Sequence, residues 1–133
     1  MKLSSEVSKK DILNIYQNVY SNHQNTNSSS VKSRISKLKK LKKNIFFYSD
    51  EIKKALFEDF KKHPSEVDIT EIYPVTSEIK HNIKNLRRWM RDDYVKTPIT
   101  FFGSRSYIKY EPKGVVLIIT PWNFPINLTF VSL

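Results

Sequence analysis

The chain has 133 residues, about the length of one domain, and its 39% hydrophobic and 13% aromatic content argues against a wholly disordered polypeptide. Its 23 Lys and Arg residues outnumber 13 Asp and Glu residues, giving a net charge of +10, and the absence of cysteine excludes disulfides and a cysteine nucleophile within these residues. Met1–Asp11 lacks the apolar core of a secretory signal and no apolar run is long enough to cross a bilayer, so a cytoplasmic protein is expected.

The first predicted element is an amphipathic helix over Val7–Tyr20, because its apolar residues lie roughly on one helical face. Ser21–Ser30 is rich in Ser and Asn, whose polar side chains compete with the backbone for hydrogen bonds. This composition predicts a loop. Residues 1–30 are therefore expected to form an N-terminal helix followed by a polar linker.

Residues 31–95 are predicted to be a helical segment, and its first helix has the clearest pattern. The apolar residues recur at spacings of three and four and face a lysine-rich side: Val31, Ile35, Leu38, Leu41 and Ile45. A basic amphipathic helix can bind nucleic acid or an anionic surface, so a non-enzymatic module acting through Lys32–Lys43 is the alternative function. A surface helix docked by its apolar side explains the same pattern, and nucleic acid is not the expected partner.

Two more helices are predicted within this segment. Ser49 has the residue type of an N-cap for a helix running to about Lys62. His63-Pro64 breaks that helix, and Ser65 with Asp68 matches a capping pattern that opens the next one, which continues to about Arg91. Pro74 lies inside this last stretch and removes a backbone donor, so it predicts either a kink or a helix start near Tyr73.

A β-hairpin is predicted over residues 96–112. Ile99–Phe102 and Ser106–Glu111 have the residue types of two short strands, and Gly103-Ser104 separates them. The next apolar run, Val115–Ile119, is bounded by prolines and a glycine and is typical of a strand buried on both faces of a parallel sheet. In such sheets ligands bind beyond the carboxyl ends of the strands, which here means Thr120–Asn123.

Gly114–Pro125, Gly-Val-Val-Leu-Ile-Ile-Thr-Pro-Trp-Asn-Phe-Pro, resembles the first nucleotide-domain strand and following turn of the aldehyde dehydrogenases. Ser106–Pro112 and Asn127-Leu128-Thr129 resemble the class 3 branch. The resemblance implies an α/β chain made of N-terminal helices, a β-hairpin and the first strand of a Rossmann-like NAD(P)-binding domain, the last over residues 113–133. In this family the hairpin belongs to the region through which subunits pair, which implies a homodimer for a complete enzyme.

The implied reaction is oxidation of an aldehyde to a carboxylic acid with NAD or NADP, and the resemblance also implies site residues. Asn123 matches the asparagine whose side-chain amide donates to the oxyanion formed when a cysteine thiolate adds to the aldehyde. Phe124 matches a substrate-channel position that is often tyrosine in class 3 relatives. The positions that match cofactor-lining residues are Ile119, Thr120, Pro121 and Trp122. The alternative role for Asn123 is a turn residue that caps a helix begun near Pro125.

Several parts of such an enzyme are missing from these residues. There is no cysteine, and neither of the two glycines, Gly103 and Gly114, opens a glycine-containing turn that could cradle a pyrophosphate. The three histidines have no ligand-like spacing, so no metal site is expected. We therefore expect the N-terminal part of a class 3-like enzyme, from a truncated, degenerate or split gene, inactive and without bound NAD(P) by itself. A complementary chain is a possible partner.

Overall fold

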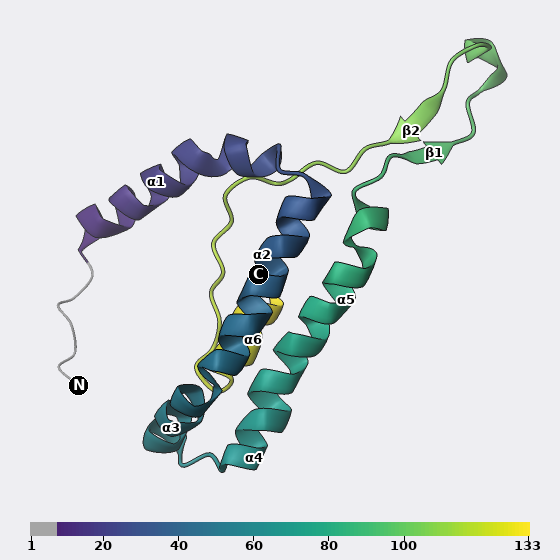
Figure 1. The fold of residues 1–133 in the computed structure, drawn as a ribbon. Coiled ribbons are helices and arrows are strands. Elements are labelled where there is room, and N and C mark those ends of the chain that lie inside the picture. Colours follow the sequence, from purple (N-terminus) through teal and green to yellow (C-terminus); the bar gives the residue numbers. More distant parts are fainter. Residues whose placement is uncertain (1–7) are drawn as a thin grey trace. The chain divides into compact units, whose positions relative to one another are not determined.

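The structure, a computed structural model, describes residues 8–133 (Figure 1). The chain divides into two compact units. Of the described residues, one unit contains 8–29 and 111–117, and the other contains 30–110 and 118–133. Val7, the first residue of the first predicted helix, lies outside the described residues.

The first unit contains helix α1, Lys9–Asn27, which begins with a capping box. Ser8 Oγ accepts a hydrogen bond from the Asp11 amide at 3.2 Å, and the Ser8 amide donates to Asp11 Oδ2 at 3.1 Å. The prediction of a loop from Ser21 onward is wrong, because the helix continues to Asn27. Asn22 Nδ2 donates to the Asn18 carbonyl at 2.8 Å, one turn earlier, so the polar side chain is satisfied without breaking the helix.

The second unit begins with helix α2, Val31–Phe47, and the helix predicted from Val31 through Ile45 is confirmed. Ser30 is its N-cap and accepts a hydrogen bond from the Ser33 amide at 3.2 Å. Helix α3, Ser49–Phe60, has Tyr48 at its N-cap, so the predicted cap Ser49 is instead the first residue of the helix. The helix ends where Lys61 adopts a left-handed backbone conformation with φ of 58°.

Three helical elements then follow without interruption: α4, Pro64–Val67; the π-helical turn η1, Asp68–Ile72; and α5, Tyr73–Trp89. The predicted Ser65 cap is wrong, since His63 Nδ1 accepts from the Ser65 amide and Pro64 occupies the first turn, where a missing N–H costs nothing. The predicted start near Tyr73 matches the first residue of α5, although α5 continues directly from the π-helical turn η1. Pro74 cannot donate to the Thr70 carbonyl, and the side chain of Asn127 donates to that oxygen instead, at 2.9 Å.

The core of this unit lies where α2 and α5 run side by side and where α6, Pro125–Val131, packs on α5 and η1 (Figure 1). The buried apolar side chains come from α2, α3, α4, η1 and α5: Ile45, Leu56, Val67, Ile72, Val75 and Ile79. Ile126 and Phe130 of α6 pack against this cluster. The short C-terminal helix is therefore anchored to the same core as the long helices.

The hairpin differs from its prediction. Strand β1, Asp93–Val95, pairs antiparallel with β2, Ser106–Ile108. The second strand begins at Ser106 as predicted but ends at Ile108 instead of Glu111, and its partner lies before the predicted first strand. The predicted strand Ile99–Phe102 is wrong, because Ile99–Phe101 forms a 3₁₀ turn, η2, in the connecting loop. Pro98 precedes this turn and lacks the N–H that a paired strand would need.

The predicted strand Val115–Ile119 is not formed. No strand beyond β1 and β2 occurs within residues 8–133, and Leu117 and Ile119 are each 84% exposed. A buried parallel strand requires neighbouring strands on both sides, and the described chain supplies none. The predicted fold class, helices combined with a β-hairpin, is confirmed. The predicted first strand of the Rossmann-like sheet is not formed within residues 8–133. No helix in that range is long and apolar enough to span a membrane.

Candidate functional site

The candidate site is the turn Thr120–Phe124, which follows the extended segment and precedes α6. Thr120 Oγ1 lies 3.1 Å from Thr129 Oγ1, so a hydroxyl contact joins the start of the turn to the helix that follows it. Two of the predicted cofactor-lining side chains, Ile119 and Trp122, are mostly exposed, and Pro121 is exposed as well. The turn is thus fixed at its base and open on its outer side.

Asn123 is exposed at the centre of this turn. Its side-chain amide makes no hydrogen bond to any other residue from 8 to 133, while its backbone carbonyl accepts one from Lys62 Nζ at 2.8 Å. The N-cap of α6 is Phe124, which makes no side-chain capping bond. The alternative role of Asn123 as a cap for this helix is therefore wrong, and its amide is left available for a ligand.

Glu71 of η1 caps α6 instead. Its Oε2 accepts hydrogen bonds from the backbone amides of Ile126 and Asn127, at 3.1 and 2.9 Å. These amides belong to the first turn of the helix, where unpaired N–H groups and the helix dipole favour a negative charge. The Glu71 side chain is fully buried, so its charge needs compensation from nearby groups.

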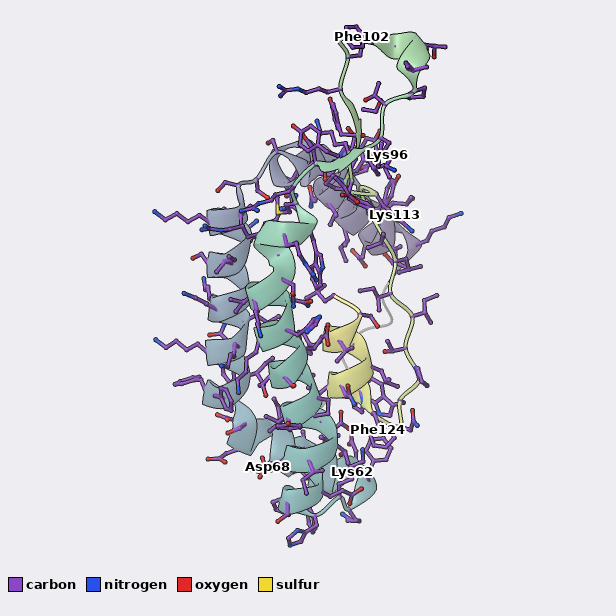
Figure 2. All side chains as sticks on the ribbon, turned by 90° about the vertical axis from the view of Figure 1, so that its right-hand side faces the viewer. Lys62, Asp68, Lys96, Phe102, Lys113 and Phe124 are labelled. Atoms are coloured by element: carbon purple, nitrogen blue, oxygen red, sulfur yellow. The ribbon has the colours of Figure 1, made fainter. Side chains whose placement is uncertain are left out.

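Lys62 supplies that compensation from just beyond the end of α3. Its Nζ lies 2.8 Å from Glu71 Oε1 and 2.8 Å from the Asn123 carbonyl oxygen, and its side chain is 10% exposed. The ammonium group also lies 4.1 Å from the centroid of the Phe124 ring, within the range of a cation–π interaction (Figure 2). One lysine therefore contacts both the candidate oxyanion donor's backbone and the candidate substrate-channel side chain.

Lys62, Glu71 and Asn127 were missed by sequence reasoning. One signal was present: Glu71 interrupts a row of apolar residues spaced by four, Val67, Val75 and Ile79. A carboxylate in such a row is expected to be buried, and a buried carboxylate requires a cation or several N–H donors. The pattern could have identified Glu71, but it could not have identified Lys62 or the amides of α6 as its partners.

The turn could hold only part of a dinucleotide. At this turn, Ile119 and Trp122 expose apolar surface to solvent. Neither glycine of the chain lies in a turn that could bind a pyrophosphate, so that part of a cofactor site is not built from these residues. No group of three or more His, Asp or Glu side chains suited to a metal ion occurs in the described part of the chain.

Comparison with known proteins gives the context of this turn. The aldehyde dehydrogenase family model matches residues 3–133. The chain is 40% identical over 100 residues to "Aldehyde dehydrogenase family 3 comG" of Dictyostelium discoideum, covering 75% of this chain and 21% of that protein. It is 41% identical over 106 residues to 4,4'-diaponeurosporen-aldehyde dehydrogenase of Staphylococcus aureus, covering 80% of this chain and 23% of the relative.

Among solved structures, a substrate-bound state of Staphylococcus aureus AldH matches with a TM-score of 0.84 and 36% sequence identity. The match covers 90% of this chain and 26% of the AldH chain. The chain thus spans about a fifth to a quarter of the length of these relatives and corresponds to the N-terminal part of the family domain. Because the family model accounts for nearly every residue and the fold agrees, the chain belongs to the aldehyde dehydrogenase family.

Proposed function

We propose that this chain supplies the oxyanion-binding turn of an NAD(P)-dependent aldehyde dehydrogenase, and that Asn123 is the donor. The observation that carries the proposal is the free side-chain amide of Asn123 on a turn whose backbone is held by Lys62. A neutral NH₂ group stabilises developing negative charge without itself changing ionisation. Since helix capping is done by Glu71, the fold gives the Asn123 side chain no structural role that competes with catalysis.

In the proposed reaction a cysteine thiolate from outside these 133 residues forms a bond to the aldehyde carbon, and the carbonyl π electrons move onto oxygen. The Asn123 amide donates a hydrogen bond to that oxyanion. A bound nicotinamide cofactor would supply the acceptor for the hydride lost from the same carbon. The resulting thioester is hydrolysed to the carboxylic acid, which frees the thiolate. Phe124 would form part of the substrate channel, and Ile119–Trp122 would line the cofactor.

Without the thiolate and the pyrophosphate turn, the isolated chain should oxidise no aldehyde. Activity requires a complementary polypeptide portion, in the same chain or in a separate one. A cytoplasmic location is part of the proposal, because the required cysteine thiolate stays reduced in that compartment. A homodimer of the assembled enzyme through the hairpin region is also part of it, supported by the exposed apolar side chains of Ile99, Phe101 and Phe102 in the connecting loop.

The test fuses this chain to the complementary portion of Staphylococcus aureus AldH and measures NAD(P)H formation with hexanal. Asn123→Ala should lower turnover by about 100- to 1000-fold, because one oxyanion donor is lost. Asn123→Asp should be at least as damaging, since a carboxylate repels the oxyanion. Asn44→Ala, on an exposed face of α2, is the matched control and should leave turnover unchanged. Full turnover of Asn123→Ala would remove the assignment.

The alternative function is binding of nucleic acid or another acidic partner. One observation favours it: a groove beside Phe46 is lined by lysines of α2 and α5, namely Lys39, Lys42, Lys43, Lys80 and Lys84. None of these lysines is buried, and a basic helix face in contact with solvent has this composition without any partner. Only the positive charge of this groove supports nucleic-acid binding, so we prefer the role in an aldehyde dehydrogenase.

A further inference from the structure

We propose that Lys62 and Glu71 are positioning residues for the oxyanion donor, acting as one buried ion pair that fixes the backbone of Asn123 and the start of α6. This inference rests on the proposed role of Asn123. Neither residue needs to contact the substrate. Their effect on the reaction would pass through the turn, whose outer side remains open.

The geometry connects three distant parts of the chain. Glu71 Oε1 and the Asn123 carbonyl oxygen each lie 2.8 Å from the same ammonium group of Lys62. Glu71 Oε2 then holds the amides of Ile126 and Asn127, on the other side of Phe124 and Pro125. The stretch from Asn123 to Asn127, where the turn passes into α6, is therefore held at both of its ends by the two members of one ion pair.

The η1 turn makes this arrangement possible. Pro74 leaves the Thr70 carbonyl without its usual helical donor, and Asn127 Nδ2 donates to it at 2.9 Å. Asn127 consequently contacts η1 twice, through its side chain to Thr70 and through its backbone amide to Glu71. These contacts lock α6 onto η1, so the N-terminus of α6 has little freedom to rotate relative to Glu71.

Burial distinguishes this pair from an ordinary surface ion pair. Lys53 and Asp68 form the comparison, with the same 2.8 Å separation of nitrogen and oxygen but side chains that are 23% and 50% exposed. Solvent screens the exposed pair, whereas Glu71 is fully buried and depends on Lys62 and the two amides for compensation. Only the buried pair also contacts the candidate site.

The first measurement is amide hydrogen exchange of the 133-residue chain itself. Glu71→Gln retains one acceptor oxygen but loses the charge, and Lys62→Met retains the apolar stem but loses the donor. Both variants should speed exchange at Ile126 and Asn127, about 10-fold or more, relative to the unchanged chain. Lys53→Met is the matched control and should leave those amides as they are. Unchanged exchange in both variants would overturn the positioning role of the Lys62–Glu71 ion pair, whatever the role of Asn123.

The second measurement is steady-state turnover of the fused enzyme described above. Lys62→Met should lower kcat by about 10- to 100-fold, since displacement of a reacting group by about 1 Å has effects of that order, while KM for hexanal changes little. Combined with Asn123→Ala, the loss should be much smaller than the product of the two single losses, because both variants remove one function.

The double variant Lys62→Met/Glu71→Gln separates positioning from simple charge balance. It leaves no unpaired buried charge, so its melting temperature should exceed that of either single variant. A residue pair that only balances charge would regain turnover together with stability. The positioning role predicts recovered melting temperature with turnover still low, because no cation holds the Asn123 carbonyl. Recovery of both properties would overturn the inference and leave the Asn123 assignment intact.

Discussion

The helical core and the hairpin loop both carry large apolar side chains, but these side chains are buried in the core and exposed in the loop. Val67 and Val75 are fully buried in the core cluster of α2, α3, α4, η1 and α5, whereas Phe102, at the tip of the hairpin loop, is 95% exposed (Figure 2). Leu117, in the extended segment, is 84% exposed. Burial differs because the helices find partners within this chain and the other two regions do not.

A hydrophobic pattern in the sequence does not specify which element covers it. An apolar stripe indicates that a surface gains free energy when it is covered, but it does not identify the covering element. For α2 and α5 that element is the neighbouring helix in the same unit. For Val115–Ile119 the pattern is typical of a buried sheet strand. This chain spans about a quarter of the length of AldH, whose additional residues could form such a sheet.

The largest expected effect is on the free energy of unfolding, and it is tested by making the same Leu→Ala substitution at a buried and at an exposed position. Leu56→Ala removes a side chain that is 4% exposed and should lower the free energy of unfolding by about 2–5 kcal/mol, through lost burial and a cavity. Leu117→Ala, at 84% exposure, should change it by less than about 0.5 kcal/mol. Urea denaturation followed by circular dichroism measures both. Equal effects at the two positions would mean that the extended segment is packed in solution.

A second experiment asks whether a partner changes the exposed segment. In the isolated chain, hydrogen exchange should find the amides of α2 and α5 protected and those of Val116–Ile119 close to unprotected, because the latter have no strand partners among residues 8–133. In the fused enzyme the same four residues should gain protection as strands pair with them. Strong protection of Val116–Ile119 in a monomeric isolated chain would contradict this account.

The smallest effect concerns α1, which lies in the other unit. Hydrogen bonds from the Ser8 hydroxyl and amide hold the pKa of Asp11 below its ordinary value of 3.8. A lowered pKa in the folded state stabilises the helix above the unfolded value, and this stabilisation is lost as pH falls through the folded value. Helical circular dichroism should therefore decline below pH 3.8. Ser8→Ala is the control, and an identical pH profile in that variant would show that the capping box contributes nothing.

Local patterns predicted the features that depend on neighbouring residues. The spacing of Leu38, Leu41 and Ile45 identified α2. The missing backbone N–H of Pro74 predicted a kink or a helix start near Tyr73, and α5 begins at that residue. The errors also arose locally, where two physical effects compete. Ser and Asn side chains after Ser21 could have favoured a loop, but they donate to carbonyls of their own helix. Ile99–Phe102 has strand-forming residues, but Pro98 and the hairpin geometry turn it into a 3₁₀ loop.

For the candidate site the sequence alone identified Asn123, because Pro-Trp-Asn after an apolar run is a motif of adjacent residues that resembles the aldehyde dehydrogenases. Only the tertiary structure showed that Asn123 does not cap α6, and that Glu71, 55 residues before Ile126, does so instead. Only the structure, too, joined Lys62 to the Asn123 carbonyl across 61 residues. The physical reason is that charge compensation of a buried carboxylate depends on distance in space, and helix periodicity carries no information about which remote donors come within 3 Å.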